Sequence, residues 1–222
     1  MRASYLKQLE TLHAELIRMG ALCEEAIQNS TQSLLSESDS FREKALEIED
    51  EINRKELEIE ALCGKLLLHE QPVAGDFRQI TAAQRMIIDL ERIGDQAANI
   101  AKISSFIKGH PLFASIPISH MAQISIQMLT DSLDSYIGKD LSKAHAVIEH
   151  DDIVDTLLKK IRKELVRLMA QDHADGGACL DLLMIAKYFE RIGDHAENIA
   201  EWVIYSITGQ HRHKENMERE TL

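Results

Sequence analysis

The chain has 222 residues, of which 45% are hydrophobic, and it contains only 10 glycines and 3 prolines. This composition supports a real core and supplies few of the interruptions that a fold of short strands needs, so long helices are favoured. The 25 Lys and Arg residues are outnumbered by 37 Asp and Glu, and a formal charge of −12 repels nucleic-acid phosphates and anionic lipids. We therefore expect no nucleic-acid binding and no direct attraction to anionic membranes.

The three cysteines, Cys23, Cys63 and Cys179, lie far apart and form no CxxC pair. This pattern argues against a disulfide framework or a zinc knuckle, and it predicts small buried side chains in a reducing compartment. Residues 1–20 lack a signal-peptide pattern, and no apolar run approaches the roughly 18 residues that a membrane span needs. The sequence thus predicts a cytoplasmic protein.

Apolar residues recur at spacings of three and four along most of the chain, which predicts amphipathic helices. The polar run 36–40 ends the first helix, and Pro72 ends the second because proline cannot continue a helix from its interior. Asp76 and Gln79 have the form of a capping box and are expected to open the third helix. The predicted helices cover residues 5–35, a segment containing 48–66 and ending at 69, 76–108, 115–137, 140–170 and 178–207.

The second half of the chain repeats the first. The sequence ERIGD occurs at 91–95 and again at 190–194, and each copy is followed by the same tripeptide, NIA. The second helices of the two halves also align, residues 49–53 with 151–155. We therefore predict an all-α fold of two tandem three-helix bundles related by internal duplication and by an approximate two-fold axis. The predicted units are residues 1–108, residues 112–208 and a mobile tail at 209–222.

Pairs of acidic or amide side chains four residues apart stand on the second and third helices of each half. This spacing places both members of a pair on one ridge of a helix, where like charges are destabilising, so the repetition predicts a compensating cation. Oxygen donors suit iron, manganese, magnesium or calcium, and zinc with less preference. The candidate metal ligands are Glu49, Asn53, Glu91 and Asp95 in the first half, and Asp151, Asp155, Glu190 and Asp194 in the second.

The alternative interpretation is that these ridges are solvated faces held by salt bridges to Arg92 and Arg191. The glycines of the two ERIGD copies, Gly94 and Gly193, bear on this choice. A glycine inside a helix costs about 1 kcal/mol relative to alanine, so its presence in both copies indicates close helix packing or a backbone that must leave room. We expect both acidic ridges to face outward.

Three segments together give the chain a specific resemblance: QPVAGDFR at 71–78, LERIGDQAANIA at 90–101 and FERIGDHAENIAEWVIY at 189–205. They resemble the PhoU family of phosphate-signalling proteins, and the resemblance extends to about residue 209. It implies a pair of three-helix bundles that bind metal clusters, of iron or zinc, at the paired motifs of the second and third helices. It also implies a negative regulator of phosphate uptake and phosphate-starvation genes.

In that family the regulator acts with the phosphate-specific ABC transporter and a sensor histidine kinase, so the resemblance predicts contacts with the transporter's ATPase subunit and the kinase. It predicts association with the membrane only peripherally, through these partners. A homodimer is a further expectation. The resemblance assigns the eight residues above as ligands of divalent or trivalent metal ions. Asn53 departs from the carboxylate of the family motif, which makes the first site one charge poorer than the second.

Other functions remain as alternatives. The chain has no Ser-His-Asp order and no glycine-rich phosphate loop, so we predict that it is not an enzyme. A carboxylate-bridged di-metal enzyme is disfavoured because the only Glu-x-x-His on a helix is Glu10 with His13. His195 follows Asp194, but Gln96 stands at the equivalent position, so it is a ligand in one half or a surface histidine. A metal-free helical scaffold is the third possibility.

Overall fold

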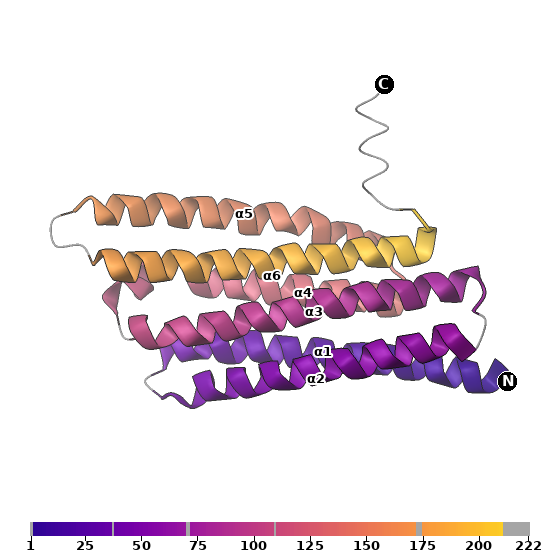
Figure 1. The fold of residues 1–222 in the computed structure, drawn as a ribbon. Coiled ribbons are helices and arrows are strands. Elements are labelled where there is room, and N and C mark those ends of the chain that lie inside the picture. The colour runs from indigo at the N-terminus through magenta and orange to yellow at the C-terminus, as the bar shows by residue number, and fades with distance from the viewer. Residues whose placement is uncertain (1, 37, 70–71, 109, 172–174, 211–222) are drawn as a thin grey trace, which may run out of the picture.

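A computed structural model gives the fold as six long helices in two groups of three (Figure 1). It describes residues 2–36, 38–69, 72–108, 110–171 and 175–210, so the predicted tail lies outside the described residues from 211 onward. These ranges contain no strand, and the predicted all-α duplication is confirmed. The elements are α1 (Arg2–Leu35), α2 (Ser40–His69), α3 (Ala74–Ile107), the short 3-10 helix η1 (Pro111–Ser115), α4 (Ile118–Gly138), α5 (Leu141–Met169) and α6 (Gly176–Thr208).

The two halves meet along two seams. Helices α1, α2 and α3 pack together, as do α4, α5 and α6, and the halves are joined by α3 against α6 and α1 against α4. Helices α2 and α5 lie at the outer edges (Figure 1). On α3, Asp89 lies 2.9 Å from His195 of α6, while Arg78 reaches the carbonyl oxygen of Ser206 at 3.4 Å. The helices of this seam are therefore antiparallel, as an approximate two-fold axis requires.

Aspartates cap the starts of α5 and α6 in the second half. Asp140 precedes α5, and its Oδ1 accepts a hydrogen bond from the Lys143 amide at 3.0 Å. Asp175 does the same at the start of α6, where it accepts from the Ala178 amide. Each carboxylate satisfies one of the unpaired amides at a helix start and lies at the positive end of the helix dipole.

Prolines account for the displacement of two predicted helix starts. Helix α3 begins at Ala74, so Asp76 lies in its first turn and makes no side-chain cap. Pro72 explains the earlier start, since the chain can enter a helix directly after a proline and Val73 keeps the extended geometry of an N-cap. Helix α4 begins at Ile118 rather than near 115, because Pro117 holds the preceding Ile116 in an extended conformation.

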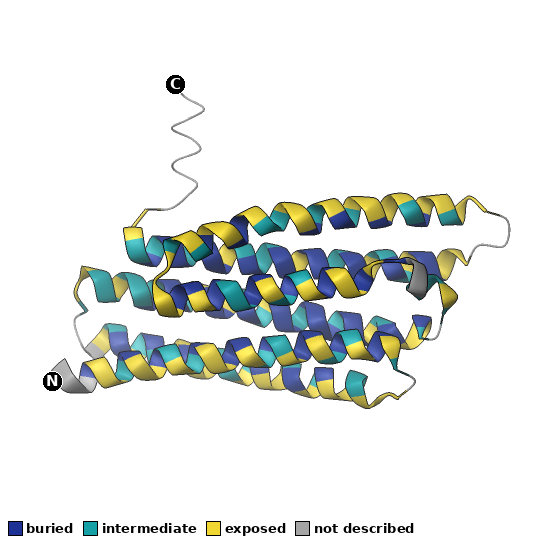
Figure 2. Cartoon of the chain, turned by 180° about the vertical axis from the view of Figure 1, so that it is seen from behind, coloured by how far each residue is buried: buried dark blue, intermediate teal, exposed yellow. Residues whose placement is uncertain are grey.

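The core runs the full length of both halves, and each helix turns one buried face toward it (Figure 2). The same tertiary hydrogen bond occurs in each half. Cys23 Sγ donates to the Leu90 carbonyl oxygen at 3.2 Å, and Ser125 Oγ donates to the Phe189 carbonyl oxygen at 3.1 Å. These residues are equivalent under the duplication.

All three cysteines are buried and free, as predicted. No described helix is long and apolar enough to cross a membrane.

Phe189 offers a test of this core, since it is the largest of the fully buried side chains. The change Phe189→Ala is expected to lower the free energy of unfolding by about 3–5 kcal/mol, because it removes apolar contacts and leaves a cavity. The control is Phe106→Ala, whose ring is 77% exposed, with an expected change within about 0.5 kcal/mol. Urea unfolding followed by circular dichroism measures both, and equal losses would contradict the assignment.

Candidate metal centres

The acidic ridges lie where an outer helix approaches an inner one most closely. A Cβ atom on Gly94 of α3 would lie 2.9 Å from Ile52 Cδ1 of α2, and one on Gly193 of α6 would lie 3.2 Å from Asp151 Oδ1 of α5. Glycine at both positions therefore lets α2 pack on α3 and α5 on α6 at short range. The expectation of close helix packing at these glycines is met in both halves.

In the first half, Glu91 of α3 is the most perturbed member of the candidate set. Its pKa is raised by partial burial and then by the charge of Asp95, and Glu56 and Glu49 of α2 add to the effect. Arg92 is more than half exposed and lies 3.4 Å from Glu91 and 3.6 Å from Asp95, so it compensates only part of this repulsion. Carboxylates of α2 therefore lie near enough to Glu91 of α3 to act on its pKa.

Asn53 contributes an amide to the same site. Its Nδ2 donates to Glu49 Oε1 at 2.7 Å, whereas its Oδ1 is buried without a hydrogen-bond partner among the described residues. An orphaned buried carbonyl oxygen costs free energy unless something binds it. This oxygen and the neighbouring carboxylates form an oxygen-rich donor set that fits a cation.

In the second half two carboxylates have raised pKa values. The pKa of Asp151 on α5 is raised to about 6 by burial and by the charges of Glu197, Asp155 and Glu190. The pKa of Asp194 on α6 is also raised to about 6, by burial and by the charges of Glu190 and Asp151. Asp151 Oδ1 is buried and has no hydrogen-bond partner in the described chain. Two helices thus bring partly buried carboxylates together here.

The expected outward orientation does not hold for Glu190. This residue is only 7% exposed, and both of its carboxylate oxygens are held by Lys187 Nζ, one turn earlier on α6. The close approach of α5 at Gly193 covers it, which sequence spacing alone does not reveal. Asp155 lies on the exposed side and pairs with Lys159 at 3.0 Å.

Two acidic residues near these sites were missed by the sequence argument. Glu56 follows Glu49 by seven residues on α2, and its pKa is raised by burial and by the charges of Glu60 and Asp95. Glu197 follows Glu190 by the same interval on α6 and is among the charges that act on Asp151. Seven residues are two helical turns, so extending each ridge by that interval could have found both.

The carboxylates do not form a preassembled cluster. In the part of the chain that the structure describes, no three His, Cys, Asp or Glu side chains converge closely enough to hold one metal ion. The donor set of each half nevertheless fits a cation, because it combines partly buried carboxylates that repel one another with one orphaned oxygen, on Asn53 in the first half and on Asp151 in the second. Binding would require side-chain rotations within the ridges.

The two histidines considered in the sequence make other contacts, and so does Trp202. His195 Nδ1 and Asn198 Nδ2 both contact Asp89 Oδ1, at 2.9 and 3.1 Å, so they connect the halves across the α3–α6 seam. The His13 ring packs edge-on against Tyr136, far from the ridges in sequence. Trp202 is partly buried, with the Arg85 guanidinium 5.7 Å above its ring.

The comparisons with known proteins agree with this geometry. The profile of the PhoU domain family matches residues 16–104 and again residues 118–203, one match in each half. The chain belongs to the PhoU family. A relative in Clostridium acetobutylicum, named phosphate-specific transport system accessory protein PhoU homolog, is 36% identical over 211 residues, which cover 94% of this chain and 96% of the relative. A relative of the same name in Aquifex aeolicus is also 36% identical, covering 93% and 96%.

Solved PhoU structures have the same fold. The crystal structure of PhoU from Pseudomonas aeruginosa matches with a TM-score of 0.88 at 32% identity, covering 93% of this chain and all of that one. The phosphate transport system regulatory protein PhoU from Streptococcus pneumoniae matches with a TM-score of 0.86 at 28% identity, covering 93% and 98%. The PhoU fold is therefore shared along nearly the whole length of the chain.

The raised pKa values predict a pH dependence of stability. An aspartate in an unfolded chain titrates near ~3.9, so Asp151 and Asp194 bind protons more tightly when folded. The stability they contribute is fully present below about pH 4 and is lost as the pH rises through about 6. In metal-free buffer, the wild type should therefore lose stability as the pH rises from about 4 to about 7, whereas the double variant Asp151→Asn with Asp194→Asn should not. The free energy of unfolding of the variant minus that of the wild type should rise over this range.

Urea unfolding at the two pH values measures this difference. The control is Glu47→Gln with Glu51→Gln, an exposed pair four residues apart on α2 and off the ridge. The control should show a smaller pH-dependent difference from the wild type. A ridge variant that tracks the wild type at both pH values would mean that these carboxylates are fully solvated.

Proposed function

We propose that this PhoU-family protein is a metal-binding negative regulator of phosphate uptake and of phosphate-starvation signalling. The names of its relatives support the regulatory part, since they are called phosphate-specific transport system accessory proteins or a phosphate transport system regulatory protein. The metal part rests on one observation. In both halves, partly buried carboxylates from two helices repel one another at equivalent positions.

The proposed metal would be a divalent or trivalent cation, with iron and zinc as the candidates from family resemblance and oxygen donors favouring iron. When bound, it would neutralise the ridge and link the outer helix to the inner one. The residues that would hold it are those of the two candidate sets, together with Glu56 in the first half and Glu197 in the second. Lys187 would release Glu190 to the cation.

The proposed partners are the ATPase subunit of the phosphate ABC transporter and a sensor histidine kinase, both met in the cytoplasm by a homodimer of this chain. A charge of −12 suits contact with basic protein surfaces, whereas it opposes direct binding to anionic lipid. We assign control by protein contact rather than by turnover. Catalysis of phosphoester hydrolysis by the metal-loaded protein would contradict that assignment.

Each half should bind metal, the second more tightly. Cation affinity rises with ligand charge, and the first candidate set has the amide of Asn53 where the second has the carboxylate of Asp155. Glu190→Ala with Asp194→Ala should abolish the tighter phase in calorimetry, and Glu91→Ala with Asp95→Ala should abolish the weaker one. Metal should also stabilise the wild type by about 2.7 kcal/mol at a hundredfold excess over Kd.

The matched control is Glu47→Ala with Glu51→Ala, which removes two exposed carboxylates at the same spacing on α2. It should keep both binding phases. Equal binding by the wild type, both ridge variants and the control would show that the ridges are solvated faces.

Deleting the gene tests the regulatory role directly. In high phosphate, the deletion should raise expression of phosphate-starvation genes, because the restraint on the kinase is lost. Reintroducing the wild type or the Glu47/Glu51 control should restore repression, whereas the Glu190/Asp194 variant should not. Unchanged expression in the deletion strain, measured by a reporter fused to a starvation promoter, would refute the proposed function.

A further inference from the structure

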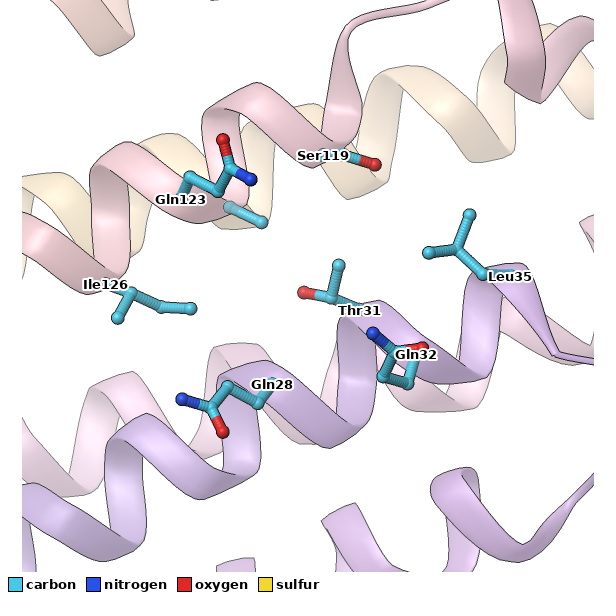
Figure 3. Close-up of a pocket in the computed structure, with 8 residues that line it drawn as sticks. Gln28, Thr31, Gln32, Leu35, Ser119, Gln123 and Ile126 are labelled. Carbon is cyan, nitrogen blue, oxygen red and sulfur yellow. The ribbon is translucent and has the colours of Figure 1, made fainter.

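A pocket of about 360 Å³ lies on the other seam of the molecule, between α1 and α4 (Figure 3). The acidic ridges lie between α2 and α3 and between α5 and α6, so the pocket shares no residue with them. Its walls come from both halves of the chain. The lining residues are Gln28, Thr31, Gln32, Leu35, Ser119, Ala122, Gln123 and Ile126.

The pocket exists because the duplication has diverged at this seam. The two family matches begin at 16 and 118, so the residue equivalent to Thr31 is Leu133 and the residue equivalent to Ala122 is Gly20. At the related position Leu133 packs directly on Gly20, where an added Cβ would lie 2.1 Å from Leu133 Cδ1. The pocket has the shorter threonine in place of that leucine, and so the space stays open.

A second substitution opens the pocket further. On the filled side, Thr130 Oγ1 donates to Glu24 Oε1 at 2.6 Å and ties α4 to α1. The equivalent positions in the pocket are Gln28 and Ile126, which cannot reproduce that charge-assisted hydrogen bond. One half of the seam is thus closed by the contact of Leu133 with Gly20 and by the hydrogen bond of Thr130 to Glu24. The half that contains the pocket lacks the equivalents of both contacts.

The walls of the pocket have a distinct chemistry. None of the lining side chains is charged. The side-chain amides of Gln28, Gln32 and Gln123 make no hydrogen bond to any described residue, and each offers both a donor and an acceptor. Leu35, which is 54% exposed, and Ile126 supply apolar surface beside these amides (Figure 3).

This combination matches a peptide better than a free metabolite. A peptide carries alternating N–H and C=O groups that need partners, and an aliphatic side chain that gains by leaving water. The volume is at the lower end for small-molecule sites, which usually enclose most of their ligand. Here the three glutamines, Ser119 and Leu35 are all exposed, so the pocket is open along the seam.

We propose that the α1–α4 pocket is a docking site for an uncharged peptide segment of a partner protein. The segment places one aliphatic side chain against Ala122 and Ile126, and its backbone amides pair with the glutamines of both walls. This inference goes beyond the proposed metal-dependent regulation and does not depend on it, because no ridge residue takes part. It gives the regulator a second contact surface, formed jointly by its two halves.

The test uses the full chain with 13C-labelled Ala, Ile and Leu methyl groups. N-acetyl-L-leucine N-methylamide should shift the methyl signals of Ala122, Ile126 and Leu35 saturably in NMR titrations. N-acetylglycine N-methylamide lacks the side chain that the pocket would bury, and N-acetyl-L-aspartate N-methylamide brings a charge to a neutral pocket. Both should bind at least about tenfold more weakly. Absence of saturable shifts, or equal binding of the three probes, would overturn the proposal.

Variants of the lining residues test whether the leucine probe binds in the α1–α4 pocket. Thr31→Leu introduces the side chain that fills the related position, so it should weaken binding of the leucine probe at least about tenfold. Ala21→Leu enlarges an exposed residue of α1 outside the pocket and should leave binding unchanged. Gln28→Ala with Gln123→Ala removes the amides without adding volume and serves if Thr31→Leu fails to fold. Undiminished binding by the folded pocket variants would refute the site.

Discussion

The close approach of an outer helix to an inner one at Gly94 and Gly193 is the constraint on which the acidic sites depend. A Cβ atom at either position would meet the Ile52 side chain of α2 at 2.9 Å or the Asp151 side chain of α5 at 3.2 Å, so any larger residue requires that side chain or its helix to shift. At this short separation, carboxylates from two helices share one partly dehydrated region. Burial and mutual repulsion then raise the pKa values of Glu91, Asp151 and Asp194 together.

Periodicity and repetition are local properties of the sequence, and they predict the fold well here. Apolar residues at spacings of three and four predict the six long helices, and the repeated ERIGD segment shows that the third helices of the two halves are equivalent. The residue at which a helix starts depends on competition between neighbouring capping and proline signals. Asp76 had a capping pattern, but the helix had already begun after Pro72. Side-chain burial depends on how two helices approach, so Glu190 could not be placed from spacing.

Each half of the duplication has an acidic residue at a position where the other half has an apolar one. Glu56 on α2 has Leu158 as its equivalent on α5, and Glu197 on α6 has Ala98 as its equivalent on α3. Each half therefore has one carboxylate that the other half lacks, and the two lie on different helices. Their charges balance, so the difference in charge between the two sites still comes from Asn53. Glu56 and Glu197 therefore do not belong to the repeated pattern, and the repeat alone does not predict them.

The polar contacts of the α3–α6 seam also decide which halves can pair. Asp89 meets His195 and Asn198 across this seam, and the equivalents of Asp89 and His195 are Tyr188 and Gln96. A first half paired with a first half of another chain would set Asp89 opposite Gln96 twice, and two second halves would set Tyr188 opposite His195. Both arrangements lose the hydrogen bonds that Asp89 makes to His195 and Asn198 in the mixed pairing. The seam thereby favours the pairing of a first half with a second half, whether in one chain or between two, and it opposes assemblies built from two like halves.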